Sequence, residues 1–236
     1  MKSVLLCGTA PVWLQKAFSE YGYSLICLGT CRALPDPTAG HIDLMSASIA
    51  GTLFLAKEAE SMFRPYIPSE QKTVICTRTL GKKYPKDVLL SVRQSGRHLI
   101  CHPRYSAEEI RFFAEKCHLT CIPVHQGYVA CTTLAIADRA VITDDPSIAK
   151  TLQASGLKVL QVLKGSVNLP GYNYGFLGGA SVYLNGTVYF FGDLRCHADF
   201  RKIEAFLKQI GVPWVSLKAG MPLQDIGGIL PVKEFS

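Results

Sequence analysis

The sequence predicts a single-domain α/β fold in which one unit, made of strand, turn, strand, helix and strand, occurs five times in a closed ring. Three observations carry this prediction: an Asn-Gly hairpin, an amphipathic helix after it, and an even spacing of the strand that follows each turn. These second strands begin about 42 to 52 residues apart, at Val4, Leu53, Leu99, Val141 and Val188. We therefore predict a five-bladed pseudo-symmetric α/β propeller.

The clearest unit lies within residues 171–221. Alternating apolar residues on both sides of Asn185-Gly186 predict a hairpin, because this dipeptide favours the positive φ angles of a tight turn. Apolar residues with helical spacing, beginning at Ile203, then predict an amphipathic helix that ends at Gly211. The segment VPWVSL supplies the closing strand.

The other units follow the same order with weaker signals. Three hairpins begin near Asp43, Asp87 and Ala130. The fifth unit is split, because SVLLCG near the N-terminus supplies its second strand and DIGGILPV near the C-terminus supplies its first. Pairing of these terminal strands closes the ring and leaves no exposed sheet edge. The predicted units are 1–40 with 222–236, 41–80, 84–125, 126–170 and 171–221.

An ordinary doubly wound sheet also alternates strands and helices, and it is the alternative fold. Parallel sheets join neighbouring strands by long crossovers, whereas this sequence places a hairpin before each helix. The hairpins therefore favour the propeller over the doubly wound sheet.

Composition excludes several classes of protein. Apolar residues make up 48% of the chain, which argues against disorder, and no apolar run is long enough to cross a membrane. The nine cysteines contain no Cys-x-x-Cys pair, so we expect reduced thiols in a cytoplasmic protein that has no metal and no cofactor. The net charge of +7 is scattered, which does not favour a nucleic-acid partner. The oligomeric state stays open.

Three segments, together with the five units, carry a resemblance to a known fold. They are QGYVAC (126–131), GYNYGFLGGAS (171–181) and LQDIGGILP (223–231). They resemble a bacterial family assigned to the pentein fold, which arginine deiminases, dimethylarginine hydrolases and amidinotransferases share with a non-catalytic, ribosome-binding translation factor. The resemblance implies a small-molecule substrate with a guanidino group, attacked by a cysteine with the help of a histidine and acidic residues.

The ring also predicts where a site would lie. In a propeller, the beginnings of the inner strands face one cavity near the axis. We count ten residues back from the first residue of each second strand and include near neighbours of these positions. They supply five polar side chains: His41, Asp43, Asp87, Cys131 and Asp225. A cytoplasmic chain rarely collects such residues at equivalent repeat positions by chance.

These residues suit the chemistry of a planar cation. Carboxylates such as Asp43, Asp87 and Asp225 can hold a guanidinium through paired hydrogen bonds. The thiolate of Cys131 can attack its carbon, and His41 can protonate the leaving amine and then activate water. Each residue also has a structural interpretation, the cysteine as a small core residue and the carboxylates as caps of backbone N–H groups.

The glycine-rich segment 171–181 is interpreted as a wall of the cavity, because its spacing fits neither a dinucleotide-binding loop nor a P-loop. Tyr128 and Asn173 are expected to line the cavity and bind the substrate. Glycines at the axis let the strands approach without side chains, and the predicted ones are Gly178, Gly179 and Gly227.

One departure from the guanidine-modifying enzymes leaves the function open. Their nucleophilic cysteine comes late in the chain, whereas the matching segment here, DIGGILPVKEFS, has none. The nearest late cysteine is Cys196, beside His197, and we interpret it as mainly structural because Asp199 suits the N-cap of the next helix. The alternative function is a non-catalytic protein that binds a ribosome, another protein or a small ligand.

Overall fold

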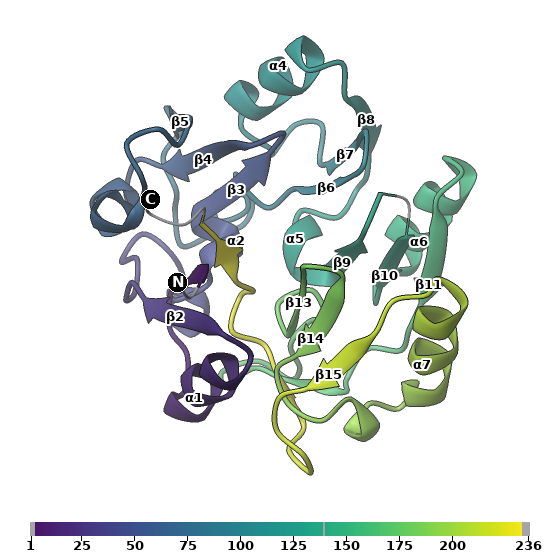
Figure 1. The fold of residues 1–236 in the computed structure, drawn as a ribbon. Helices are drawn as coiled ribbons and strands as arrows, with labels where there is room; N and C mark the ends of the chain where they lie inside the picture. Colours follow the sequence, from purple (N-terminus) through teal and green to yellow (C-terminus); the bar gives the residue numbers. More distant parts are fainter. Residues whose placement is uncertain (1–2, 139, 233–236) are drawn as a thin grey trace.

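The computed structural model describes residues 3–138 and 140–232, and its strands form small separate sheets (Figure 1). In four three-stranded sheets the first two strands pair antiparallel and the last two pair parallel. These sheets are β3 (Ser46–Ile49), β4 (Thr52–Ala56) and β5 (Thr73–Cys76); β6 (Arg93–Ser95), β7 (His98–Cys101) and β8 (Thr120–Pro123); β9 (Thr133–Ile136), β10 (Ala140–Thr143) and β11 (Lys158–Gln161); and β13 (Ser181–Leu184), β14 (Thr187–Phe190) and β15 (Trp214–Ser216). The predicted strand order within these units is confirmed.

The fifth three-stranded sheet contains both ends of the described chain. Its strands are β17 (Leu230–Pro231), β1 (Ser3–Cys7) and β2 (Tyr23–Cys27). β17 pairs antiparallel with β1, which places Leu5 opposite Pro231, and β1 pairs parallel with β2. The predicted pairing of the terminal strands is therefore present. Within the described residues the sheets stay separate and do not join into one closed sheet.

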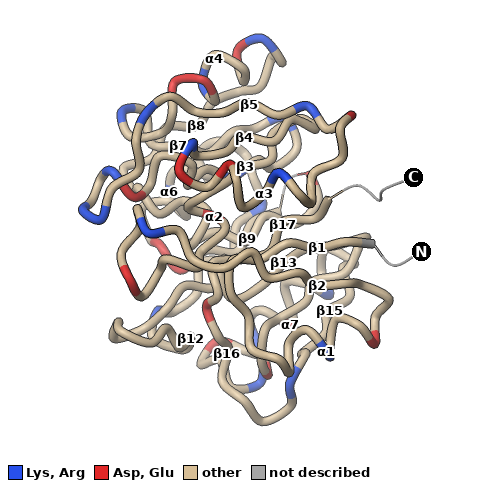
Figure 2. The backbone as a smooth tube through the Cα atoms, turned by 90° about the vertical axis from the view of Figure 1, so that its left-hand side faces the viewer, with Lys and Arg blue, Asp and Glu red and all other residues tan. Residues whose placement is uncertain are grey.

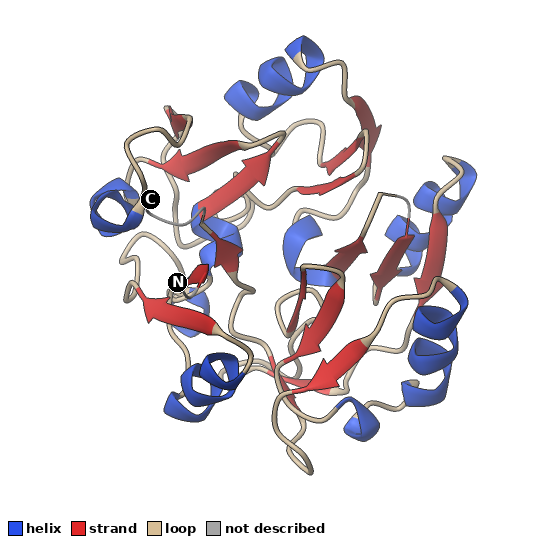
Figure 3. Cartoon of the chain, viewed as in Figure 1, coloured by secondary structure: helices blue, strands red, loops and turns tan. Residues whose placement is uncertain are grey.

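A helical segment connects the second and third strand of every three-stranded sheet, as a parallel pair requires. The segments are α1 (Val12–Glu20), α3 (Glu60–Phe63) with the 3₁₀ turn η2 (Arg64–Tyr66), α4 (Glu108–Lys116), α6 (Pro146–Ala154) and α7 (Phe200–Gln209). Figures 1 and 3 show that these helices lie at the outside of the molecule. Pro65 and Pro68 explain why α3 is the shortest of them.

Local sequence explains the boundaries of these elements. Asn185 and Gly186 have φ angles of 46° and 84°, and they form the predicted tight turn between β13 and β14. Asp145 caps α6, because its side chain accepts two backbone N–H groups of the first turn. The spacing of Ile203 and Leu207 turns both side chains of α7 into the core.

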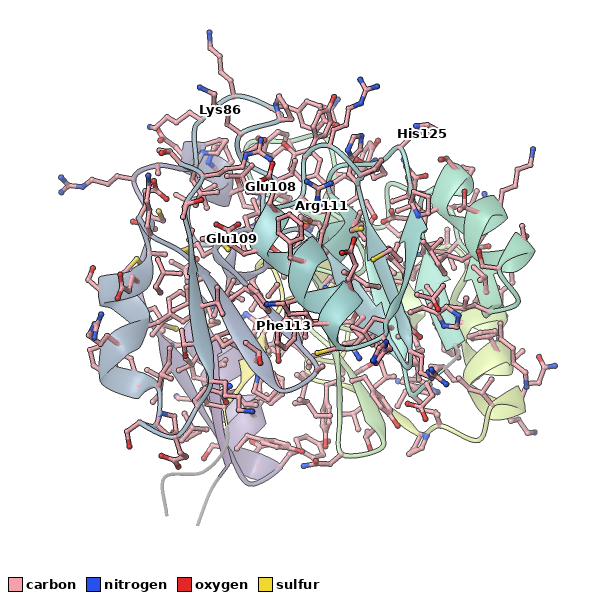
Figure 4. The ribbon with its side chains drawn as sticks, turned by 90° about the horizontal axis from the view of Figure 1, so that it is seen from above. Lys86, Glu108, Glu109, Arg111, Phe113 and His125 are labelled. Atoms are coloured by element: carbon pink, nitrogen blue, oxygen red, sulfur yellow. The ribbon has the colours of Figure 1, made fainter. Side chains whose placement is uncertain are left out.

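Two of the outer helices also contact a neighbouring unit. Phe113 of α4, labelled in Figure 4, meets Phe54 of β4 edge to face, with ring centroids 5.2 Å apart. Phe18 of α1 meets Tyr189 of β14, with ring centroids 5.7 Å apart. Apolar contacts of this kind hold adjacent units together.

Two one-turn helices differ from the sequence-based prediction. α2 (Ile42–Met45) precedes β3, and α5 (Val129–Thr132) precedes β9 (Figure 1). The sequence places Asp43 and Cys131 at the beginnings of strands, but the structure places them in these helical turns. A four-residue turn has no periodicity from which it can be recognised. The two helices lie near the centre of the view, where the units converge.

The first strands of the five sheets surround one cavity of about 210 Å³, which we call the central cavity. Its lining contains residues of β3, β6, β9, β13 and β17. Asp43 and Arg93 are the charged residues in that lining. The inner strands therefore enclose a polar space at the middle of the fold.

The remaining elements are short. β12 (Val167–Asn168) and β16 (Leu223–Gln224) form an unpredicted parallel pair, and η1 (Asp36–Thr38) and η3 (Leu194–Cys196) are 3₁₀ turns. Figure 2 shows Lys and Arg interspersed with Asp and Glu along the backbone, as the sequence indicates. In the part of the chain that the structure describes, no helix has the length and apolar character needed to span a membrane.

Candidate functional site

Four of the predicted site residues meet in one buried cluster. His41 is the N-cap of α2, Asp43 lies in its first turn, and Cys131 lies in α5. The Nδ1 atom of His41 is 3.8 Å from Oδ1 of Asp225 and 4.0 Å from Oδ1 of Asp43. Potential metal-ligand atoms of His41, Asp43 and Cys131 all lie within 4.8 Å of one another. The fold thus brings together a thiol, an imidazole and two carboxylates.

Hydrogen bonds explain why residues from separate units meet. Equivalent segments are joined in succession around the cluster by four hydrogen bonds of 3.0–3.1 Å: Asp43 N to Gly227 O, Gly228 N to Gly179 O, Gly179 N to Cys131 O, and Ala130 N to Ser91 Oγ. These segments come from all five predicted units. The cluster therefore lies where these five segments approach one another.

A second cavity, of about 280 Å³, lies beside the cluster, and we call it the site cavity. Five predicted site residues line it: His41, Tyr128, Cys131, Asn173 and Asp225. The rest of the lining consists of Thr38, Leu44, Leu169, Tyr172, Tyr174 and Phe176. Asp43 belongs to the same cluster but lines the central cavity instead.

The three predicted glycines lie where any side chain would collide with the site. A Cβ atom on Gly178 would overlap the backbone of α5, and one on Gly179 would overlap the carboxylate of Asp225. A Cβ atom on Gly227 would overlap His41, and its φ of 75° also favours glycine. Close backbone approach, and not phosphate binding, accounts for these glycines.

Asp87 lies elsewhere than the sequence predicts. It is buried behind Tyr128, whose hydroxyl donates a 2.5 Å hydrogen bond to Oδ2, and it does not line the site cavity. His41 and Asp87 occupy equivalent positions in the repeat alignment, but His41 precedes a helix and Asp87 precedes a succession of turns. The two side chains therefore point in different directions. We therefore assign Asp87 to the positioning of Tyr128 and not to contact with a substrate.

Burial controls the protonation of the cluster. It raises the pKa of Asp43 to about 6, although the charge of His41 opposes the rise, and it raises the pKa of Asp225 in the same way. Burial also raises the pKa of Cys131 well above its usual range, and the two carboxylates raise it further. Cys131 therefore rests as a thiol, and a cation bound beside it would favour the thiolate.

Arg93 belongs to the site and is missed by the sequence analysis. It lies in β6, and its Nη2 donates a 2.6 Å hydrogen bond to the carbonyl oxygen of Ala130 in α5. Its guanidinium lowers the pKa of Asp43, against the larger effect of burial. The sequence offers one signal for Arg93, which is an arginine in the inner strand of its unit. The site residues were predicted from positions ten residues before each second strand, and Arg93 does not lie at such a position.

Asp144 is a second residue that the sequence analysis misses. Its Oδ2 accepts a 3.1 Å hydrogen bond from Leu177 N, while Oδ1 has no hydrogen-bond partner among the described residues. Burial raises the pKa of Asp144 to about 7, and the charge of Asp225 adds to the rise. The residue follows β10, so it lies outside the aligned positions from which the site was predicted.

Cys196 does not line either cavity. Its neighbour His197 is buried, and Nδ1 of that ring accepts a 3.0 Å hydrogen bond from Asp199 N. Asp199 takes the predicted N-cap position of α7, but its carboxylate accepts from Leu163 N and pairs with Lys202 instead of capping the helix. These contacts tie the trio to the surrounding backbone.

The cluster of His41, Asp43 and Cys131 also has the donor types that Zn²⁺ binds. No metal site is predicted from the sequence, because the chain contains no Cys-x-x-Cys pair. Cys131 lies in another predicted unit than His41 and Asp43, so spacing could not have revealed that the three residues meet. Chemically, the arrangement can hold a metal ion or hold and attack a cationic carbon.

Comparisons with known proteins identify a sequence family and, separately, a fold. The sequence matches the family of unknown function DUF6873 over residues 8–230, and no curated protein matches it. Among solved structures, DDAH from Pseudomonas aeruginosa in complex with citrulline has a TM-score of 0.57 at 9% identity, covering 98% of this chain and 99% of that one.

Two further solved structures are similar. Agmatine deiminase from C. jejuni has a TM-score of 0.56 at 10% identity, covering 99% of this chain and 94% of that one. Inosamine-phosphate amidinotransferase from Streptomyces griseus has a TM-score of 0.54 at 11% identity, covering 94% and 79%. At such low identity the likeness shows the fold and not the reaction. The chain therefore belongs to the family of unknown function DUF6873 and has the pentein fold of the guanidine-modifying enzymes.

Proposed function

We propose that this protein is a hydrolase or transferase of guanidino compounds, with Cys131 as the nucleophile and His41 as the proton carrier. One observation carries the proposal. The Nδ1 atom of His41 is buried without a hydrogen-bond partner among the described residues, and the buried carboxylate of Asp43 beside it faces the thiol of Cys131. Buried polar atoms are rarely left unpaired in folded proteins, so these atoms are arranged for a ligand that supplies donors and positive charge.

We infer that the five sheets are the blades of one propeller, with the units 1–40 plus 222–236, 41–80, 84–125, 126–170 and 171–221. The hydrogen bonds between equivalent segments support this division, because each unit contributes one segment to the cluster. The central cavity supports it too, since the first strand of each sheet lines it.

Substrate binding follows from the charges. A guanidinium in the site cavity lies next to Asp225, whose carboxylate is held in place by N–H groups of Phe176 and Gly227. Asp43 adds a second negative charge beside the thiol. The bound cation lowers the pKa of Cys131, so the nucleophile forms only when the substrate is present.

The chemical steps then balance. The thiol proton of Cys131 passes to the imidazole of His41, and the thiolate forms a bond to the guanidino carbon. The bond from that carbon to the leaving nitrogen breaks, and the nitrogen takes its electron pair and the proton from His41. In hydrolysis, water gives a proton to His41 and its oxygen bonds to the carbon, while the bond from carbon to sulfur breaks and the sulfur takes that proton back from His41. The protonated ureido product releases its extra proton to water. In transfer, an acceptor amine replaces the water.

The alternative is a non-catalytic binding protein with the same fold. It is favoured by the state of Cys131, whose side chain is almost fully buried and whose raised pKa makes the free thiol unreactive. The cysteine also lies in a different unit from the one that the guanidine-modifying enzymes use, and the matching C-terminal segment contains none.

A turnover assay tests the proposal. Purified protein is incubated with arginine, agmatine, a methylated arginine and benzylguanidine, with and without an acceptor amine and with and without a metal chelator. Released ammonia or amine and the ureido or amidino product are measured. We expect turnover by the wild-type protein, loss of activity in Cys131→Ser, and retention in the matched control Cys196→Ser. Full activity in Cys131→Ser refutes the mechanism, and absence of turnover with every compound favours the binding protein.

A further inference from the structure

The lining of the site cavity combines acidic and aromatic residues. His41, Cys131 and Asp225 supply the acidic part. In the aromatic part, next to it, the rings of Tyr128 and Phe176 stack at 6.4 Å, and Tyr174 meets Phe176 edge to face at 6.0 Å. A ligand that has its cationic carbon beside Cys131 therefore extends its substituent among aromatic rings.

The lining contains no Lys or Arg to pair with an anionic group. Lys and Arg are absent from the residues that line the site cavity, all of which lie in the described chain, and Asp225 is the charged residue among them. A carboxylate on the substituent would be removed from water without a cation and would be repelled by Asp225. Removing such a charge from water without a cationic partner is unfavourable.

The neutral hydrogen-bonding groups of the lining are hydroxyls and one amide. The hydroxyl of Tyr128 already donates to Asp87, and the hydroxyl of Thr38 donates to Pro35 O. Asn173 supplies an amide, and Tyr172 and Tyr174 supply hydroxyls. Leu44, Leu169 and the ring of Phe176 form the apolar part of the wall. These groups can satisfy a neutral polar substituent, but none of them neutralises an anionic one.

Size and exposure narrow the choice further. The volume of about 280 Å³ lies near the lower end of the range for small-molecule sites, which favours a small ligand. Tyr172 and Tyr174 are 49% and 37% exposed, so they mark the mouth of the cavity. Their rings can cover an apolar group, but they offer no ion pair.

We propose that the site cavity selects guanidines that carry a small, uncharged aryl or alkyl substituent and that it discriminates against guanidines with a carboxylate. The inference rests on the proposed function for the orientation of the ligand, with the guanidinium at Asp225 and Cys131. The substituent then lies between Tyr128, Phe176 and the leucines. A second charged group has no matching position in the lining.

Binding to the Cys131→Ser variant tests this selection without turnover. Isothermal titration compares benzylguanidine, agmatine and arginine, which share the guanidinium and differ in the charge of the substituent. We expect benzylguanidine to bind at least about tenfold more tightly than arginine, with agmatine between them. In Tyr174→Lys, which adds a cation at the mouth, the preference over arginine narrows. The matched control Phe112→Lys, at a 60% exposed position on α4 outside the cavity, leaves it unchanged.

The outcomes separate this inference from the proposed function. Tighter binding of arginine than of benzylguanidine overturns the inference and leaves guanidine chemistry intact. Selective binding of benzylguanidine without turnover by the wild-type protein supports the ligand class and refutes catalysis. Failure of all three compounds to bind overturns both.

Discussion

Asp144 and Asp145 are adjacent carboxylates with opposite electrostatic surroundings, and substitution of each tests how burial controls charge near the site. Burial raises the pKa of Asp144 to about 7. Burial acts in the same direction on Asp145, but N–H groups of α6, Gln126 and Lys164 outweigh it and hold the pKa below its usual value. Asp144→Asn and Asp145→Asn remove one charge each and keep a hydrogen-bond acceptor.

The sign and size of the effect follow from linkage. A carboxyl group with a raised pKa in the folded protein stabilises it below the unfolded pKa of about 3.9, and this contribution is lost as the pH rises to about 7. The pKa difference of about three units corresponds to about 4 kcal/mol at most, and relaxation of the site reduces it to about 2–4 kcal/mol. For Asp145, with its lowered pKa, the charge instead stabilises the protein above pH 4.

Chemical denaturation at pH 4.5 and pH 8 measures both effects. We expect Asp144→Asn to be more stable than the wild-type protein at pH 8 by about 2–4 kcal/mol and nearly equal to it at pH 4.5. Asp145→Asn is expected to lose about 1 kcal/mol at pH 8, because the α6 cap loses its charge. The reasoning is refuted if Asp144→Asn is destabilised equally at both pH values, since Asp144 would then contribute through its ionised form.

Three further predictions concern the cluster. In Asp43→Asn, we expect Cys131 to react with iodoacetamide at least about tenfold faster at pH 8, as measured by peptide mass spectrometry. The carboxylate of Asp43 lies within about 5 Å of the thiol, and at an effective dielectric constant of about 20 its charge disfavours the thiolate by about 3 kcal/mol. An unchanged rate would contradict this expectation. Gly179→Ala is expected to lower kcat/KM and to reduce the free energy of unfolding by about 1–3 kcal/mol, because the added Cβ overlaps the carboxylate of Asp225. Unchanged kcat/KM would argue against a role for that carboxylate. In Arg93→Met, loss of the guanidinium raises the pKa of Asp43 above about 6, so we expect the acid limb of the pH–kcat/KM profile to move to higher pH. An unchanged profile would show that Arg93 does not influence the ionisation that controls activity.

The repeat and much of the site can be predicted from the sequence because their signals are local. Asn185-Gly186 favours its turn through its own φ angles, and the helix that contains Ile203 and Leu207 is visible in its apolar spacing. Equivalent positions in a repeat point to equivalent places in space, so the ten-residue spacing also placed Asp43 and Cys131 side by side. These predictions needed no knowledge of side-chain contacts.

The remaining features depend on contacts that a repeat does not encode. The turns of α2 and α5 are too short to show a period, and β12 and β16 pair over two residues each. The role of Asp87 depends on the direction of a turn, which placed it behind Tyr128. Arg93 reaches α5 from the central cavity, and its side-chain length rather than its sequence position brings it to the site.

The most direct test of the account is the identification of the group that carries a reaction intermediate. The wild-type protein is mixed with a guanidino substrate, quenched in acid during turnover, digested and analysed by mass spectrometry. We predict an amidino or substituted amidino adduct on the peptide that contains Cys131, and none on the peptide that contains Cys196. Turnover with no adduct on Cys131, or with the adduct on another cysteine, would contradict the central claim.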